Sequence, residues 1–427
     1  MDYIFEFVKQ NEFTIATCIL IGAYISIAIE KIPKAVTALI GASLIVVLKI
    51  LDQHEAFKFI DFNVIFLLTG MMIIVNVTQK TGVFRWMALE TVRFAKGHPV
   101  KILVIFSIIT AVFSAFLDNV TTVLLMAPIT LVVAKEQKIS PFPYFISEIL
   151  ASNIGGTATL IGDPPNIMIG SAAGLNFMDF LIHLTVPVVI IFIIFMAMMY
   201  FIFRNQLVVD TERMEELSKI DNSHSITDYK LLKICLVVLF FVILGFIFHG
   251  KLHYEASTIA MAGASILLIF ESPKEIIEEV EWTTIFFFVG LFIIIGGVEK
   301  VGLIEILAEE ALNLTNKDLT MTTILILWVS AILSAIIDNI PYTATMIPMV
   351  EHLGNYMDAA PLWWALALGA CLGGNGSIIG ASANVIVCDI STSAGYPIRF
   401  MTFLKYGIPV MIMSLIISTI YLYIFYL

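Results

Sequence analysis

The sequence predicts an all-α polytopic membrane protein, with about ten transmembrane helices and two re-entrant hairpins arranged as two inverted-topology repeats. Of the 427 residues, 59% are hydrophobic and 13% are charged, and the mean hydropathy is +0.98. Because a soluble globular protein carries roughly a quarter charged residues, this composition indicates a bilayer environment. The apolar runs lack the period-2 alternation of an outer-membrane barrel. A second observation, an internal repeat, predicts how the helices are arranged.

The charge balance and the cysteines exclude several classes of protein. Lys and Arg number 23 against 34 Asp and Glu, and the net charge of −11 argues against a nucleic-acid partner. The four cysteines are scattered through apolar segments without a C-x-x-C pair, so we expect core packing and no disulfide. The sequence contains no nucleotide-binding motif and no histidine cluster, so we expect neither enzymatic activity, nor a catalytic residue, nor a cofactor.

The two halves of the chain resemble each other. IFLLTGMMIIVNVTQKTGVFRWMA (65–88) matches 285–308 at an offset of 220, and the same offset superposes FSAFLDNVTTVLLMAPI on LSAIIDNIPYTATMIPM. IGGTATLIGDPPNIMIG falls on LGGNGSIIGASANVIVC at an offset of 218. The matching segments come in the same order, which indicates a tandem duplication. The predicted repeats are residues 1–203 and 231–427, joined by a cytoplasmic linker at 204–230.

The first repeat is expected to contain five spans and one hairpin. We expect spans near 13–31, 35–51 and 62–79, an amphipathic stretch at 81–98, short arms at 102–117 and 120–133, an interrupted segment at 144–180 and a span at 183–203. The arms of about 16 and 14 residues are too short, at 1.5 Å per residue, to cross roughly 30 Å of hydrocarbon comfortably. That length is typical of a re-entrant hairpin. Because five is an odd number, the second repeat must be inverted.

Charge asymmetry supports the inversion independently. The segment after the third span is basic in the first repeat, whereas its counterpart in the second repeat is acidic. Basic loops stay in the cytoplasm, so this rule places Lys31, Lys34 and the linker inside. It also places both termini on the outer side of the membrane, which we expect to be the inner or plasma membrane of the cell.

Polar residues interrupt the apolar segments at four places, two hairpin tips and two glycine-rich breaks. Inverted repeats with broken helices are typical of a secondary transporter whose binding site lies near the membrane midplane. The residues expected to bind the transported substrate or ion are Asp118, Asn119, Thr121, Thr122, Gly155, Gly156, Thr157, Thr159, Asp163, Asn166, Asp338, Asn339, Thr343, Gly373, Gly374, Asn375, Ser377 and Asn384.

The chemistry of these breaks suits small ions. Free carbonyls at C-terminal helix ends favour cations, and free N–H groups at N-terminal ends favour anions. Asp, Asn and Thr oxygens are hard ligands, so a Na⁺ ion is expected at Asp118, Asn119, Asp338 and Asn339. A carboxylate can also exchange its proton for the cation. The alternative is that Asp118 or Asn119 only caps the returning arm, and that Asp163, which precedes two prolines, only forms a turn.

The motifs LDNVTTVLLMAPIT, IGGTATLIGDPPNIMIGSAAG, DNIPYTATMIPM and GGNGSIIGASANVIV resemble those of the ion transporter superfamily, in the right order over nearly the whole chain. They resemble most the branch of arsenical-pump permeases, NhaD-type sodium–proton antiporters and the melanosomal P-protein, with a citrate-transporter-like fold. The resemblance implies a homodimer in which a transport part moves as an elevator against a scaffold. Carried over, residues 1–100 and 231–318 are scaffold, and 101–203 and 319–427 are the transport part.

The hairpin tips depart from the sodium-coupled carboxylate carriers of this superfamily, which have Ser-Asn-Thr at both tips. The matching residues here are Asp118-Asn119-Val120 and Asp338-Asn339-Ile340. Two carboxylates repel a dicarboxylate unless they are protonated or neutralised. The sequence therefore favours Na⁺/H⁺ antiport by an elevator-type mechanism.

Two other functions stay open at this stage. The first is Na⁺- or H⁺-coupled transport of an anion such as arsenite, citrate or a dicarboxylate, and the second is a passive anion channel. The expected partners are membrane lipid, a small inorganic ion or small anion as substrate, and a second copy of the chain. The coupling ion is expected to be Na⁺, H⁺ or both.

Overall fold

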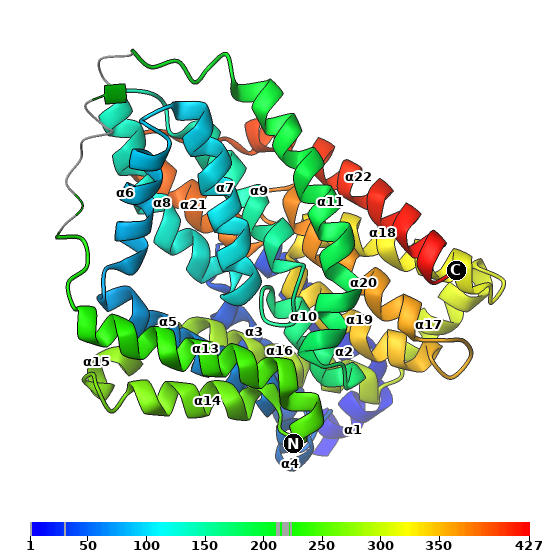
Figure 1. The fold of residues 1–427 in the computed structure, drawn as a ribbon. Helices are drawn as coiled ribbons and strands as arrows, with labels where there is room; N and C mark the ends of the chain where they lie inside the picture. The colour runs from blue at the N-terminus through cyan, green and yellow to red at the C-terminus, as the bar shows by residue number, and fades with distance from the viewer. Residues whose placement is uncertain (1, 30, 211–213, 216–221, 223) are drawn as a thin grey trace.

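The computed structural model describes all residues except 1, 30, 211–213, 216–221 and 223, so part of the predicted linker lies outside the described residues. Throughout the described chain the regular secondary structure is helical, without a strand (Figure 1). Nine of the described helices are long and apolar enough to cross a membrane. The all-α polytopic fold class is thereby confirmed.

The helices of the two repeats correspond one to one, from α2–α11 to α13–α22. The first set is preceded by α1 (Asp2–Gln10) and comprises α2 (Glu12–Ile29), α3 (Lys34–Val47), α4 (Gln53–Lys58), α5 (Phe62–Lys80), α6 (Val83–Phe94), α7 (Pro99–Phe116), α8 (Asn119–Gln137), α9 (Phe142–Gly156), α10 (Pro164–Ala173) and α11 (Phe177–Phe203). The second comprises α13 (Tyr229–Leu252), α14 (Ala256–Leu267), α15 (Pro273–Glu278), α16 (Trp282–Lys300), α17 (Leu303–Leu314), α18 (Leu319–Ile337), α19 (Asn339–Leu353), α20 (Ala360–Gly373), the 3-10 turn η1 (Gly374–Gly376), α21 (Ser382–Ser393) and α22 (Phe400–Phe425).

The hairpin arms are longer than the sequence predicts. α7 holds 18 residues because Pro99 begins the helix, and α8 holds 19 because it continues through Lys135 and Glu136. Both arms of this hairpin are among the nine long apolar helices. Conversely, α3 has only 14 residues where a span at 35–51 is predicted, because the chain leaves the helix at Lys49, whose φ is +60°.

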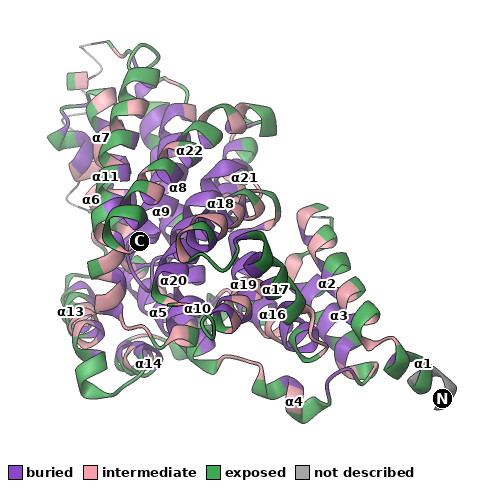
Figure 2. Cartoon of the chain, turned by 90° about the vertical axis from the view of Figure 1, so that its right-hand side faces the viewer, coloured by how far each residue is buried: buried purple, intermediate pink, exposed green. Residues whose placement is uncertain are grey.

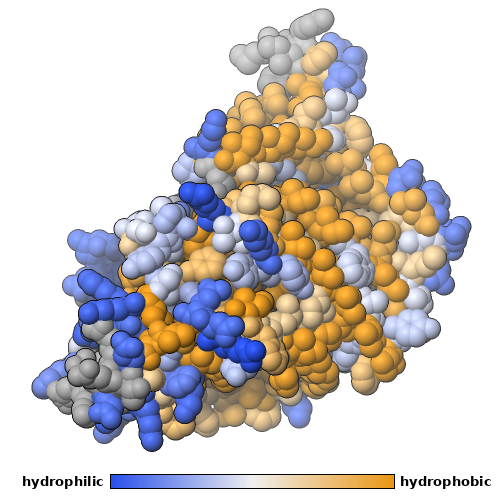
Figure 3. Space-filling model, turned by 90° about the horizontal axis from the view of Figure 1, so that it is seen from above, coloured by the Kyte–Doolittle hydropathy of each residue, from blue (hydrophilic) through white to orange (hydrophobic). Residues whose placement is uncertain are grey.

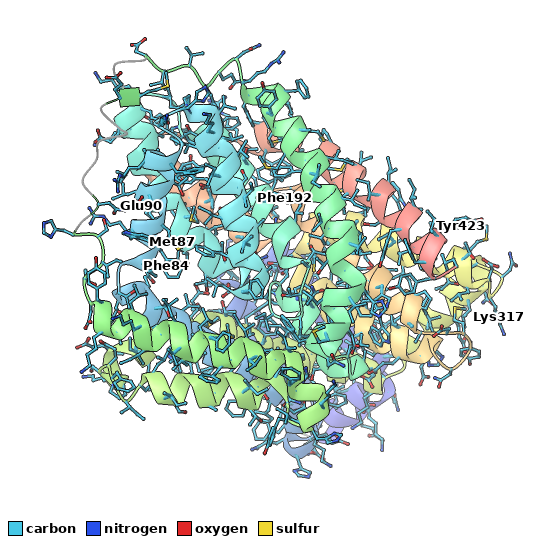
Figure 4. The ribbon with its side chains drawn as sticks, in the orientation of Figure 1. Phe84, Met87, Glu90, Phe192, Lys317 and Tyr423 are labelled. Atoms are coloured by element: carbon cyan, nitrogen blue, oxygen red, sulfur yellow. The ribbon has the colours of Figure 1, made fainter. Side chains whose placement is uncertain are left out.

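The amphipathic stretch predicted at 81–98 is largely confirmed by α6. Phe84 is buried, and its ring meets that of Phe113 edge-on with centroids 5.5 Å apart. Trp86 on the opposite face is exposed. Phe84, Met87 and Glu90 follow one another along the helix (Figure 4). The helix therefore presents one apolar face to the hairpin, and its exposed face carries Arg85 and Arg93 beside Trp86.

The two repeats are intertwined. α3 packs against α16 of the second repeat, and α14 packs against α5 of the first. Both crossings depend on a glycine, since a Cβ on Gly290 would lie 2.6 Å from the carbonyl carbon of Ala38, and one on Gly70 would lie 2.8 Å from that of Ala260. Small residues let helix backbones approach closely in this way. These equivalent contacts indicate a pseudo-two-fold relation between the repeats.

The centre of the molecule is formed by α9 and α20, which are buried along almost their whole length (Figure 2). α5, α13 and α14 lie side by side at one edge, at the bottom of Figure 1. α2, α3 and α16 lie together at another side, to the right in Figure 2. A helix that is apolar all round is suited to such a central position.

The outer surface suits a bilayer. Seen from above, apolar residues cover much of the molecule, while hydrophilic residues gather mainly towards its edges (Figure 3). Large apolar side chains on α11, α13 and α22 are exposed, among them Ile193 at 63%, Phe241 at 61% and Phe425 at 66%. Exposed apolar surface of this extent indicates contact with lipid.

The crossing of α7 and α9 gives a first test of the packing. A Cβ on Gly155 would lie 2.1 Å from the carbonyl oxygen of Ala111, so Gly155→Ala must separate the two helices. Overpacking costs about 1–3 kcal/mol or more, and we expect a clearly lower thermal unfolding midpoint in detergent. Gly22→Ala is the control, because a Cβ there has no neighbour within 4 Å. Equal midpoints for the two variants would contradict this account of the crossing.

Candidate functional site

A cavity of about 660 Å³ lies where the two hairpin tips meet. Asp118 from the first tip and Asp338 from the second both line it, so the two acids selected from the sequence share one cavity. Three further charged residues stand in its wall: Lys34, Glu281 and Asp389. The rest of the lining is mainly aliphatic, with hydroxyls from α16 and α21.

Six helices begin at this cavity. They are α3, α8, α10, α16, α19 and α21, whose first residues or N-caps are Lys34, Asp118, Pro164, Glu281, Asp338 and Ser382. Each helix N-terminus carries a partial positive charge of about half an elementary charge. These ends stabilise carboxylates, which explains physically how several acids can stand around one cavity.

Asp118 caps α8. Its Oδ1 accepts a hydrogen bond from the backbone N–H of Thr121 at 2.8 Å, and its Oδ2 accepts one from the Thr121 hydroxyl. Its side chain lines the cavity although the residue is only 8% exposed. The capping interaction considered as an alternative is therefore present, and the same carboxylate also faces the cavity. Binding of an ion by Asp118 stays a prediction.

Asp338 is held in a strained backbone conformation. Its φ of +118° is rare for a residue other than glycine and costs of order 1–3 kcal/mol. Oδ1 accepts from the backbone N–H of Ile340 at 3.0 Å. Oδ2 lies 3.3 Å from both Nζ of Lys34 and Oγ of Ser382. Strain of this kind persists where surrounding contacts determine the position of the residue.

The sequence predicts Lys34 on the cytoplasmic side, and the structure places its side chain in the wall of the cavity. The positive-inside rule counts a lysine near a span end as a loop charge. The cytoplasmic side of Lys34 stays a prediction. α3 begins beside the hairpin tip of the other repeat, so the ammonium of Lys34 faces the cavity. Lys31, three residues earlier, is exposed.

Asn153 joins the two repeats at the centre of the structure. Its Nδ2 donates to Oδ1 of Asn375 at 3.0 Å and to Oδ1 of Asn384 at 2.9 Å. Its Oδ1 accepts from Nδ2 of Asn119 at 3.3 Å. Three residues selected from the sequence therefore meet at one asparagine that was not selected. The signal was its position in the buried helix end, directly before Ile154 and the glycine pair.

Asn166 and Asn384 have the same role in the two repeats. Nδ2 of Asn166 donates to the carbonyls of Thr157 and Thr159, at 3.1 and 2.8 Å. Nδ2 of Asn384 donates to two carbonyls of the second break, at 2.7 and 2.8 Å. These carbonyls, which the sequence suggested as bare cation ligands, thus already accept hydrogen bonds, and that of Ser377 also accepts one from the backbone N–H of Gly380 at 3.3 Å. A carbonyl that accepts only one hydrogen bond keeps a second lone pair for another partner.

Asp163 is completely buried. Both of its carboxylate oxygens lie 3.1 Å from Nδ2 of Asn339, so the loop of one repeat contacts the hairpin tip of the other. Cys371 lies nearby and its Sγ is 3.5 Å from Oδ1 of Asn166. Cys371 occupies the position equivalent to Asn153. Asn153 contacts Asn384 of the second repeat, and Cys371 contacts Asn166 of the first, so this position joins the repeats in both directions.

Most of the remaining residues that the sequence predicted for the site contribute hydrogen bonds or close packing at the helix breaks. Hydroxyls at equivalent positions donate to carbonyls of the hairpin arms, from Thr159 to Ala115 and from Ser377 to Ala335. The Thr343 hydroxyl donates to a carbonyl of its own helix. The four selected glycines leave little or no room for a Cβ, whose nearest neighbours would lie 2.1, 2.5, 2.5 and 3.2 Å away at Gly155, Gly156, Gly373 and Gly374. Thr122 is buried, and its hydroxyl has no hydrogen-bond partner.

A second cavity of about 470 Å³ adjoins the first, since Met72 and Glu281 belong to the walls of both. Thr121, Lys80 and Glu279 also line it. In the described part of the chain, no group of three or more His, Cys, Asp or Glu side chains is placed to hold a metal ion. The Na⁺ site expected at the tips stays a prediction.

Comparison with known proteins identifies the family. Residues 24–369 match the family described as citrate transporter. The chain belongs to the citrate transporter family. It is therefore a membrane transporter, and the resemblance to the ion transporter superfamily is confirmed.

Relatives of this transporter cover nearly its whole length. An uncharacterized transporter of Mycobacterium tuberculosis is 43% identical over 422 residues, which is 96% of this chain and 98% of the relative. The 46 kDa membrane protein of Mycobacterium leprae is 44% identical over 423 residues, 97% and 99% of the two chains. The human P protein is 31% identical over 501 aligned positions, covering 97% of this chain and 60% of the P protein.

A solved structure shares the fold of this family member. The YdaH transporter of Alcanivorax borkumensis superposes with a TM-score of 0.58 at 12% sequence identity, over 87% of this chain and 86% of that one. At this identity the likeness concerns the fold alone.

The asparagine at the centre gives a second test. Asn153→Ala leaves Nδ2 of Asn119 and the Oδ1 atoms of Asn375 and Asn384 without their hydrogen-bond partner, and an unpaired buried polar group costs about 1–3 kcal/mol. We expect a strongly lowered thermal unfolding midpoint. Cys371→Ala at the equivalent position loses only weak thiol contacts, with Asn166 and Asp163, and should lower the midpoint much less. The reverse order would contradict the central role of Asn153.

Proposed function

We propose that this transporter exchanges a small cation for protons, most concretely Na⁺ for H⁺, through the cavity between the hairpin tips. The charge of the cavity wall carries the proposal. Among the described lining residues, Asp118, Glu281, Asp338 and Asp389 contribute four carboxylates against the single ammonium of Lys34. A cation entering this space gains Coulomb energy that an anion would lose, and the gain is larger where water is excluded.

The carboxylate of Asp118 is the proposed proton carrier in the same cavity. Asp118 is the N-cap of α8 and also lines the cavity. Its carboxylate accepts two hydrogen bonds, both from Thr121. A carboxylate without a nearby cation can be protonated when the cavity is empty and ionised when a cation is bound. Ionisable residues inside membrane proteins commonly mark ion pathways and proton relays.

An elevator-type movement is part of the proposal. α3 with α16 and α5 with α14 form crossings between the repeats in the part assigned to the scaffold, 1–100 and 231–318. The hairpins and broken helices, in 101–203 and 319–427, pack mainly with one another, as α7 does with α9 and α18 with α20. This grouping is compatible with one part that moves against another. We propose a homodimer, with both termini outside, as the membrane assembly.

The family description favours a second candidate, a citrate-like anion coupled to Na⁺ or H⁺. Six helix N-termini and Lys34 could offset the charge of such a cargo. We rank it second because the carboxylates of the hairpin tips already cap two of those N-termini, α8 and α19, and add negative charge to the cavity.

Proteoliposomes test the first candidate. We expect a Na⁺ gradient to drive proton movement, read with a trapped pH dye, and Asp118→Asn to reduce it to the level of protein-free vesicles, because the amide cannot release a proton. Glu278→Gln is the control, since this glutamate is exposed on α15 and lines neither cavity. Unchanged proton movement in Asp118→Asn would remove Asp118 from the proposed role.

Uptake of radiolabelled citrate into the same vesicles separates the two candidates. With an inward Na⁺ or proton gradient, we expect no accumulation above protein-free vesicles, because the tip carboxylates repel the anion. Vesicles from the same preparation that show Na⁺-driven proton movement serve as the positive control. Gradient-dependent citrate accumulation would favour the anion carrier instead.

A further inference from the structure

Lys34 is held like a bound cation. Its Nζ lies 3.3 Å from Oδ2 of Asp338 and donates to Oγ of Ser382. The Ser382 hydroxyl lies 3.3 Å from the same carboxylate oxygen, and Nζ stands 5.0 Å from the ring centroid of Phe287. A carboxylate, a hydroxyl and an aromatic face together suit a small cation. The ammonium therefore occupies one end of the cavity in place of a free ion.

This ion pair connects two separate parts of the fold. Lys34 begins α3, which packs against α2 and α16 at one side of the molecule (Figure 2). Asp338 lies 304 positions away, at the tip between α18 and α19. The side chain of Asp338 is 7% exposed and that of Lys34 is 30% exposed, so the ammonium still faces the open cavity. Any cation that uses this carboxylate must compete with Lys34.

The equivalent acid of the first repeat has no such partner. α14 begins with Ala256 where α3 begins with Lys34. Among the described residues, no Lys, Arg or His nitrogen lies within 4.0 Å of the Asp118 carboxylate. The two tip acids occupy equivalent positions of the two repeats, but only Asp338 has a lysine beside its carboxylate. Asp338 is neutralised by the protein itself, whereas Asp118 is not.

We propose that Lys34 is a tethered counter-cation of Asp338, which the transported cation must displace to reach the second tip carboxylate. This inference rests on the proposed cation exchange. With Lys34 in place, an entering Na⁺ meets Asp118, Glu281 and Asp389 but shares Asp338 with the ammonium. The competition weakens cation binding and thereby promotes release of the ion from the cavity.

A lysine in such a cavity could instead hold a carboxylate of the cargo. The contacts favour the counter-cation role, because Asp338 and Ser382 already accept two of the three N–H donors of Lys34. Three other carboxylates in the wall would also repel an anionic cargo.

Na⁺ binding to the purified full-length protein tests the proposal, measured as thermal stabilisation by NaCl against choline chloride at constant ionic strength. Lys34→Met should lower the apparent Kd for Na⁺ by about tenfold, a typical size for coupling between two sites, because the competitor is gone. Lys34→Arg keeps the charge and should stay within about threefold of the wild type. Lys31→Met removes an exposed charge from the same loop and should leave the Kd unchanged.

A pair of variants keeps the test decisive if Lys34→Met does not fold. Asp338→Asn alone leaves the ammonium unpaired beside the site, whereas the double variant Lys34→Met, Asp338→Asn leaves neither charge. We expect the single variant to bind Na⁺ about tenfold more weakly than the double variant, because the freed ammonium repels the ion. Equal Kd values for these two variants would overturn the proposal.

The outcomes separate this inference from the proposed function. If Na⁺ stabilises the wild type, and the Kd of Lys34→Met for Na⁺ is unchanged or higher, the role of Lys34 is overturned and the proposed cation exchange still stands. A wild-type protein that Na⁺ does not stabilise would overturn both. Stabilisation by citrate that is lost in Lys34→Met would overturn both as well, and would make Lys34 a ligand of an anion.

Discussion

The fold depends on satisfying the backbone groups that four helix breaks set free inside a membrane protein. Where a helix stops in the interior, its carbonyl and amide groups need partners from the protein, because lipid offers none. Asn166 and Asn384 supply them to the two glycine-rich breaks, each donating from one amide nitrogen to two or more carbonyls. Asn153 then joins these breaks across the centre. Without this network, α9 and α20 could not end beside each other in the core.

The same breaks determine where charge can stand. Six helices begin around one cavity, and their N-termini favour carboxylates, so acids that would be costly in hydrocarbon are stabilised there. The carboxylate of Asp118 accepts hydrogen bonds from the backbone and hydroxyl of Thr121, in the helix that Asp118 caps. Asp338 has a strained backbone conformation, and its carboxylate lies beside Lys34 and Ser382. The cavity thus combines fixed dipoles, four acids and one base within a small volume.

Duplication followed by divergence explains the asymmetry between the repeats. The glycine crossings at Gly70 and Gly290 are preserved, because a Cβ would push the backbones apart. Some polar positions, such as the tip Asp-Asn pairs, are preserved, whereas others are not: the counterpart of Asn153 is Cys371, and that of Asp163 is Ala381. Packing constrains both halves equally, whereas a charge such as that of Asp163 or Lys34 is present in only one half. A pseudo-symmetric scaffold with an asymmetric site is the result.

The sequence by itself determined the all-α membrane fold, the duplication, the breaks and the two tip acids, because hydropathy, repeat offsets and glycine placement are local properties of the chain. It also indicated the asparagines at the breaks, although their binding roles stay predictions. Only the tertiary structure decided that Lys34 faces Asp338, that Asn153 joins the repeats and that the break carbonyls are already hydrogen bonded. These contacts join residues up to 304 positions apart. Which side chains meet at such distances depends on how the intertwined helices cross, and no local pattern encodes that.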